Sequence, residues 1–264
     1  MSITPITDIY VDKYVVFLDL LGFKSKVKDA DTNPEVRKEL LNVLGTLRDT
    51  LCNNDRLGMR FTHFSDCIIF TANRSSEGLW EILESINVLT VNLLNYDFLV
   101  RGGLAVGGAH HDENFVYGLA VNRAYEIESK DAVFPMTLVS NEVIADAKAY
   151  GTQFDEFLSQ DANGCYFVHY LKSYAEYRGF LHLGHIGRPG DVILDFSGRK
   201  IVDFICHQLN TCSDQGILKK VTWFQDYWNN NVATEKGFKR IEAGVTERDF
   251  EGYPTIIHKR ILRI

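Results

Sequence analysis

Cysteine is scarce in this sequence, and the few cysteines are not arranged in pairs. The 264 residues contain five, an odd number, and none of them form a CxxC spacing. Disulfide frameworks need paired cysteines and structural zinc sites need closely spaced ones, so we expect neither. This usage fits a reducing compartment, and we expect a cytoplasmic protein.

The sequence also lacks clusters of basic residues. It has 28 Lys and Arg against 35 Asp and Glu, a net charge of −7. Proteins that bind nucleic acid neutralise phosphates with grouped Lys and Arg, so the composition argues against a nucleic-acid partner. The short basic run at residues 24–28 is interpreted as a solvated face.

Long apolar runs are absent as well. No stretch approaches the roughly 18 apolar residues that span a bilayer, and residues 1–5 do not begin a signal peptide. We therefore expect a soluble protein with no membrane partner. Apolar residues still make up 45% of the sequence, which is enough for a substantial core.

The first half of the sequence alternates between strand-like and helix-like patterns. Helix-like periodicity follows Asn33, a suitable cap, and Pro34, and two strand-like runs flank Ser65–Asp66 at the spacing of a tight hairpin. The expected strands are 15–20, 59–64, 67–71 and 100–107, and the expected helices are 34–51 and 76–94. This order predicts an α+β fold of the ferredoxin-like βαββαβ type.

The remaining sequence is less regular. Further strands are expected at 115–117, 137–139, 165–171 and 192–196, and further helices at 119–129, 200–209 and 218–228. The pair Gly102–Gly103 inside a strand indicates a bulge or a close backbone approach. We expect a core at 1–145 and a C-terminal α/β extension at 146–264 packed on it.

Two aspartates stand at the edges of apolar strands. Asp19 follows the first strand, and Asp66 lies in the hairpin. In a split βαβ sheet the first and third strands are central neighbours, so the two carboxylates can meet and hold one or two Mg²⁺ or Mn²⁺ ions. Each aspartate alone is better explained as a turn or strand-end residue, whereas the pair favours a metal site.

Three segments resemble class III nucleotidyl cyclases. Phe17-Leu18-Asp19-Leu20-Leu21-Gly22-Phe23 resembles their FxDxxGF metal-binding motif, Phe64-Ser65-Asp66 resembles the hairpin with their second metal-binding aspartate, and Gly118-Leu119-Ala120-Val121-Asn122-Arg123-Ala124 resembles their GxxVNxA helix start. The resemblance spans about residues 14 to 140. It implies a cyclase fold and a nucleoside triphosphate substrate.

The resemblance also implies the roles of particular residues. Asp19, Asp66 and the Leu20 carbonyl would hold two metal ions per site, and the backbone of residues 21–23 (Leu21, Gly22 and Phe23) would contact the phosphates. Asn122 would orient the ribose. In this family the site lies at a dimer interface, so the resemblance implies a homodimer with two equivalent sites.

The sequence departs from the family at three positions. Glu126 stands where a transition-state arginine is usual, and Arg101 or Arg123 could replace it or form structural salt bridges. Thr62 and Leu119 occupy base-reading positions without the usual adenine- or guanine-reading side chains. The combination resembles the pyrimidine cyclases of bacterial antiphage signalling (Pycsar), which implies a cyclic UMP or cyclic CMP product. UTP and CTP both remain open.

Two other functions remain possible from the sequence. A catalytically degenerate, cyclase-like nucleotide sensor is favoured by Glu126 and opposed by the two aspartates. A polymerase-like domain would share the carboxylate pair but would need a basic surface for its template. Residues 110–112 (His-His-Asp) could ligate a metal, but adjacent strand residues point apart, and we expect a polar loop there.

Overall fold

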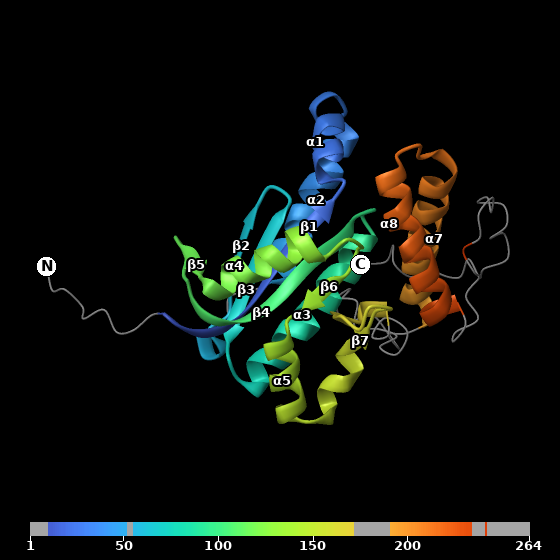
Figure 1. Ribbon diagram of the computed structural model, residues 1–264. Helices are drawn as coiled ribbons and strands as arrows, with labels where there is room; N and C mark the ends of the chain where they lie inside the picture. Colours follow the sequence, from blue (N-terminus) through green and yellow to red (C-terminus); the bar gives the residue numbers. More distant parts are fainter. Residues whose placement is uncertain (1–9, 52–54, 172–190, 234–240, 242–264) are drawn as a thin grey trace, which may run out of the picture. The chain divides into compact units, whose positions relative to one another are not determined.

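The computed structural model describes residues 10–51, 55–171, 191–233 and 241 (Figure 1). The chain divides into two compact units, one of residues 1–86 with 100–168 and the other of residues 87–99 with 169–264. The expected boundary at residue 145 stays a prediction. Within the described ranges, no helix is both long and apolar enough to cross a membrane.

The first unit is built on a mixed sheet. Its strands follow the order β2-β3-β1-β4-β6-β8-β7, and β5 pairs with β4. Their bounds are β1 Val11–Leu21, β2 Arg60–Phe64, β3 Cys67–Asn73, β4 Leu99–His111, β5 Val116–Gly118, β6 Thr137–Val139, β7 Leu158–Gln160 and β8 Tyr166–Val168. The helix α1 (Phe23–Thr32) and the helix α2 (Pro34–Thr50) join β1 to β2, and α3 (Ser76–Leu94) joins β3 to β4. This order, with β1 between β3 and β4, confirms the predicted ferredoxin-like core.

Local signals explain most of these elements. Asn33 caps α2, because its side-chain Oδ1 accepts a hydrogen bond from the backbone N–H of Glu35 at 3.0 Å. The sequence did not predict α1, whose side chains are mostly polar; only Phe23 and Ala30 of this helix are buried. The remaining elements are α4 Leu119–Glu126, α5 Asn141–Tyr150, α7 Asp191–Thr211, α8 Gln215–Trp228 and the short helical turns at 55–57, 127–131, 152–157 and 229–233.

One expected strand was wrong. Residues 192–196 lie inside α7, which runs from Asp191 to Thr211 and belongs to the second unit. A short apolar run has no period of its own, so it cannot distinguish a buried strand from one stretch of a longer helix.

The central strands have two different faces. The core face carries Leu18 and Leu20 of β1 and Ile68 and Phe70 of β3, all at most 2% exposed. The opposite face, here called the α4 face, carries the alternate residues of the same strands, and those at the end of β1 and the start of β3 are only half-buried. They include Phe17, Asp19, Cys67 and Ile69, with Thr62 of β2 in register opposite Ile69. Because strand side chains alternate, the Asp19 carboxylate faces away from the core, whereas the side chain of Leu20, predicted to contribute only its carbonyl, faces the core.

The helix α4 lies against the α4 face beside β1 and β4 (Figure 1). The rings of Phe17 and Tyr125 meet edge to face with centroids 5.2 Å apart. A Cβ atom on Gly103 would overlap the Ala124 carbonyl oxygen, and one on Gly102 would lie 2.6 Å from the Phe17 carbonyl oxygen. The glycine pair therefore marks a close backbone approach, as predicted, while its pairing with β6 continues in register.

Candidate metal and nucleotide site

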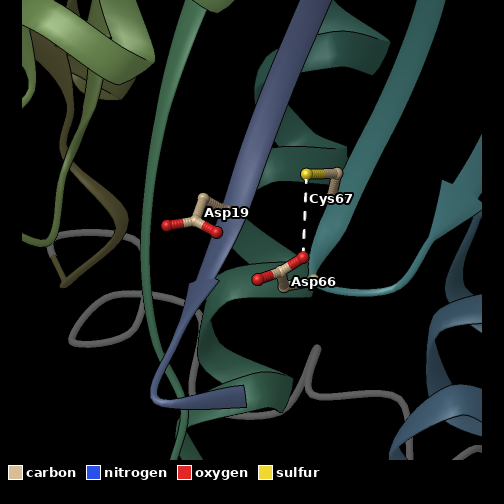
Figure 2. Close-up of side chains that lie close together, drawn as sticks. All are labelled: Asp19, Asp66 and Cys67. Atoms are coloured by element: carbon tan, nitrogen blue, oxygen red, sulfur yellow. Dashed lines mark hydrogen bonds between the residues drawn. The ribbon is translucent and has the colours of Figure 1, made fainter. Parts of the chain in front are cut away.

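The end of β1 and the β2–β3 turn bring two carboxylates together. The Leu20 N–H donates to the Asp66 carbonyl oxygen at 3.0 Å, and Asp19 lies in register opposite Cys67. Ser65 closes the turn in the left-handed region, with φ 56°. As a result, one ligand atom each from Asp19, Asp66 and Cys67 all lie within 4.8 Å of one another (Figure 2). This spacing is suited to a shared cation.

The sulfur of Cys67 is not an effective ligand for such a cation. Burial raises the pKa of its thiol to about 11, and the carboxylates of Asp66 and Asp19 add to the shift. The protonated thiol points to Asp66, with Sγ 3.9 Å from Oδ1 (Figure 2). Hard cations such as Mg²⁺ and Mn²⁺ prefer oxygen ligands, so the two carboxylates fit them.

Arg101 of β4 lies between two acids of its own chain. Its Nε is 3.3 Å from Asp19 Oδ2 and 2.7 Å from Glu128 Oε1. Glu128, in the π-helical turn after α4, is 3% exposed; burial raises its pKa, while the Arg101 guanidinium lowers it. The ion pairs match the structural interpretation of Arg101, and they balance the charge of Asp19. A catalytic role for Arg101 stays a prediction.

The segment after Asp19 forms the start of a helix. Leu21 ends β1, Gly22 has φ 87°, and α1 begins at Phe23. The left-handed φ suits glycine, which has no Cβ. The Gly22 carbonyl oxygen accepts from the N–H groups of Ser25 and Lys26. Leu21, Gly22 and Phe23 thus form a helix N-terminus beside the carboxylate pair, a position that favours phosphate oxygens.

The other predicted residues lie at the surface around α4. Asn122 is exposed, Leu119 is 76% exposed, and the Leu119 N–H donates to the Tyr10 hydroxyl at 3.2 Å. Glu126 lies 3.2 Å from Lys130 and 3.9 Å from Arg123, measured between charged atoms. Arg123 therefore faces an acidic neighbour on its own helix.

Thr62 has a partner that the sequence did not reveal. Its Oγ1 lies 2.8 Å from Nε2 of His111, whose Nδ1 lies 3.1 Å from Oγ1 of Thr71. The interpretation of residues 110–112 as a polar loop was wrong for both histidines. His110 and His111 are the buried last residues of β4, because this strand continues four residues beyond its apolar part.

These elements define an α+β fold of the ferredoxin-like type with a carboxylate pair at the end of its first strand. No protein-family model matches the sequence, and no curated protein matches it. Solved structures of nucleotidyl cyclases are similar to the chain. The adenylyl cyclase CyaB from P. aeruginosa is 14% identical, with a TM-score of 0.46 over 60% of this chain and 94% of that one.

A dimeric guanylyl cyclase domain of the RhoGC fusion protein from Blastocladiella emersonii is 17% identical, with a TM-score of 0.43 over 60% of this chain and 96% of that one. A class III adenylyl cyclase-like ATP-binding protein from Pseudomonas aeruginosa is 13% identical, with a TM-score of 0.40 over 61% of this chain and 41% of that one. At these identities and TM-scores, the similarity describes the fold, and the function of the chain has to be inferred from the residues of its site.

Proposed function

We propose that the chain is a nucleotidyl cyclase of the class III type that acts on a pyrimidine nucleoside triphosphate, UTP or CTP, in the cytoplasm. One observation carries this proposal. Asp19 and Asp66 are far apart in sequence but lie within metal-bridging distance of each other. They lie beside the N-terminus of α1, whose backbone N–H groups can bind phosphate oxygens. The motifs FxDxxGF and GxxVNxA are the second line of support.

Each site residue would have a separate role in cyclisation. Asp19, Asp66 and the Leu20 carbonyl would hold two Mg²⁺ or Mn²⁺ ions, which when bound would stabilise negative charge on the triphosphate. The backbone N–H groups around Gly22 would bind phosphate oxygens. Asn122 would orient the ribose, so that its 3′-oxygen lies in line with the α-phosphorus and pyrophosphate leaves opposite. Before the nucleotide arrives, Arg101 neutralises Asp19.

We also propose that the active form is a homodimer with the site shared between subunits. Asn122 is exposed, and several exposed apolar side chains lie on or next to β2, β5 and α4. These side chains are Phe64 of β2, Tyr117 of β5, Leu119 and Tyr125 of α4, and Phe115 just before β5. A second copy of the chain could cover them and bring its Asn122 to the carboxylate pair of the first.

Subunit mixing tests the shared site. Asp19→Ala and Asn122→Ala should each be inactive alone, whereas a mixed dimer keeps one intact site. An equal mixture should therefore recover about a quarter of the wild-type rate per subunit. A mixture that stays inactive while mixed dimers form would contradict the shared site.

The pyrimidine assignment follows from the base-reading positions. Thr62 and Leu119 replace the side chains that usually distinguish adenine from guanine, and the product would be cyclic UMP or cyclic CMP, a messenger in antiphage defence. The test incubates the protein with Mn²⁺ and each of the four ribonucleoside triphosphates and identifies the products by mass spectrometry. A product from ATP or GTP alone would contradict the pyrimidine assignment.

A second candidate function is a cyclase-like nucleotide sensor without turnover. Glu126 occupies the position of the usual transition-state arginine and pairs with Lys130 and Arg123. A carboxylate therefore replaces the positively charged donor at this position. Loss of a transition-state donor typically costs about a hundred- to a thousandfold in rate. Pyrophosphate release distinguishes the two, because a sensor binds the triphosphate and releases none.

A further inference from the structure

Thr62, His111 and Thr71 form a hydrogen-bonded chain that crosses the sheet. They come from β2, β4 and β3, and β4 is not adjacent to either of the other two strands. His111 is 5% exposed and Thr71 is fully buried, whereas Thr62 is half-buried. The chain therefore begins in the interior at Thr71 and ends near the surface at Thr62.

The imidazole in the middle is neutral. Burial, followed by the positive charges of Lys13 and Arg60, lowers the pKa of His111 to about 4. A neutral imidazole has one nitrogen that donates and one that accepts. The two threonines must therefore play opposite roles toward it.

The burial of Thr71 decides which nitrogen carries the hydrogen. A buried hydroxyl needs an acceptor for its proton, and leaving it unsatisfied costs about 1–3 kcal/mol. His111 Nδ1 lies 3.1 Å from the Thr71 Oγ1, so we infer that the Thr71 hydroxyl donates its proton to this nitrogen. Nδ1 then accepts, Nε2 carries the hydrogen, and the Nε2–H donates to Thr62 Oγ1 at 2.8 Å.

Thr62 is left with its own proton to donate. Its oxygen already accepts from His111, and its half-exposed position lets the O–H point outward. We propose, building on the proposed function, that His111 is a positioning residue that makes Thr62 a hydrogen-bond donor, and that this donor selects UTP over CTP. At the 4-position uracil has a carbonyl oxygen, which accepts, whereas cytosine has an amino group, which donates and would oppose Thr62.

The first experiment observes the imidazole directly. Nitrogen-15 NMR of histidine-labelled protein without nucleotide reports which ring nitrogen of His111 carries the hydrogen. We expect the hydrogen on Nε2 at pH 7. A hydrogen on Nδ1, or a doubly protonated ring, would overturn the inference whatever the protein catalyses.

The second experiment measures base selection without turnover. Dissociation constants are determined by calorimetry with Mn²⁺ for 3′-deoxy-UTP and 3′-deoxy-CTP, which lack the oxygen needed for cyclisation. We expect wild type to bind the uridine analogue roughly tenfold or more tightly than the cytidine analogue. Thr62 gains a hydrogen bond to the uracil oxygen, whereas the cytosine amino group would place a second donor against it. His111→Gln and Thr71→Val should reduce this ratio toward one, and Thr62→Val should abolish it.

His110→Gln is the matched control. His110 is the neighbouring residue, is 6% exposed, and hydrogen-bonds Asp112, so its variant should keep the wild-type ratio. Thr71→Val nearly preserves the shape of the side chain and removes its hydroxyl. It therefore still tests the hydrogen-bonded chain if His111→Gln does not fold. If both analogues bind and the variants leave the ratio unchanged, the inference fails while the cyclase proposal survives. If neither analogue binds, the proposed function fails as well.

Discussion

The two faces of the central sheet are built in different ways. On the core face, Leu18, Leu20 and Phe70 are buried almost completely by apolar contacts. On the α4 face, polar side chains satisfy one another in pairs and chains, as Arg101 does with Asp19 and Thr62 with His111. The core face can tolerate repacking, whereas the polar groups on the α4 face depend on particular partners.

The largest expected effect is on activity and comes from the α4 face. Asp66→Asn removes the charge of one carboxylate but keeps its shape, and we expect the rate of cyclic nucleotide formation to fall by about a hundredfold or more. The measurement is pyrophosphate release with Mn²⁺, and the melting temperature should stay close to that of wild type. Asp155→Asn, at an exposed aspartate in a short helical turn, is the control and should retain full activity.

The core face should respond in stability instead. Leu18 is fully buried, and Leu18→Ala should lower the free energy of unfolding by about 2–5 kcal/mol in urea. Ile69→Ala, on the half-buried α4 face of β3, removes less buried surface and should cost less. An equal or larger cost for Ile69→Ala would contradict the distinction between the two faces.

Arg101 tests the dependence on particular partners. Arg101→Met leaves the buried Glu128 without its cation, and with Arg101 partly exposed we expect a loss of roughly 2 kcal/mol in the free energy of unfolding. Adding Glu128→Gln removes the stranded charge and should recover most of that loss. If the double variant is no more stable than Arg101→Met, the pair does not carry the stability assigned to it.

The smallest expected effect concerns a polar cluster at the margin of the core face. Asp146 binds Arg74 and accepts a hydrogen bond from Tyr14, and the Arg74 hydrogen bonds are the main reason that the pKa of Asp146 is lowered. Its contribution is present above the usual aspartate pKa of about 4 and is lost as the pH falls through the lower folded value.

Asp146→Asn should therefore flatten the decline in unfolding free energy on acidification. Because Arg74 is partly exposed, we expect a difference below about 1 kcal/mol. Urea unfolding from pH 6 down to pH 3 measures it. A decline that is as steep in the variant as in wild type would assign the pH dependence to other groups.

The core face and the main elements could be predicted from the sequence because their signals are local. The apolar run of β1, the periodicity of α2 and the two-residue spacing of the hairpin each lie within a short stretch. The carboxylate pair could be predicted too, once the strand order placed β1 beside β3. The helix α1 could not be, because its side chains are mostly polar.

The partners on the α4 face could not be predicted from the sequence. Glu128 is 27 residues from Arg101 in the chain, and His111 is 49 residues from Thr62. Nothing in a short window links such residues, because their contacts depend on the curvature of β4 and the placement of α4. Histidine is also a polar residue type that is less often fully buried than the apolar residues, so a pair of histidines followed by aspartate is typical of a surface loop. This explains the incorrect loop interpretation.

Gly103 of β4 sets the spacing between the sheet and α4 beside the site. At Gly103 the strand, which has no side chain there, packs directly against the Ala124 carbonyl of α4 and the Ile127 side chain that follows it, so the missing Cβ allows their close approach. The strand carries Arg101 two residues away, and the helix carries Asn122. Every side chain added at this joint acts as a spacer that lifts the whole helix, so the height of Asn122 above the sheet is determined by the absence of a single methyl group.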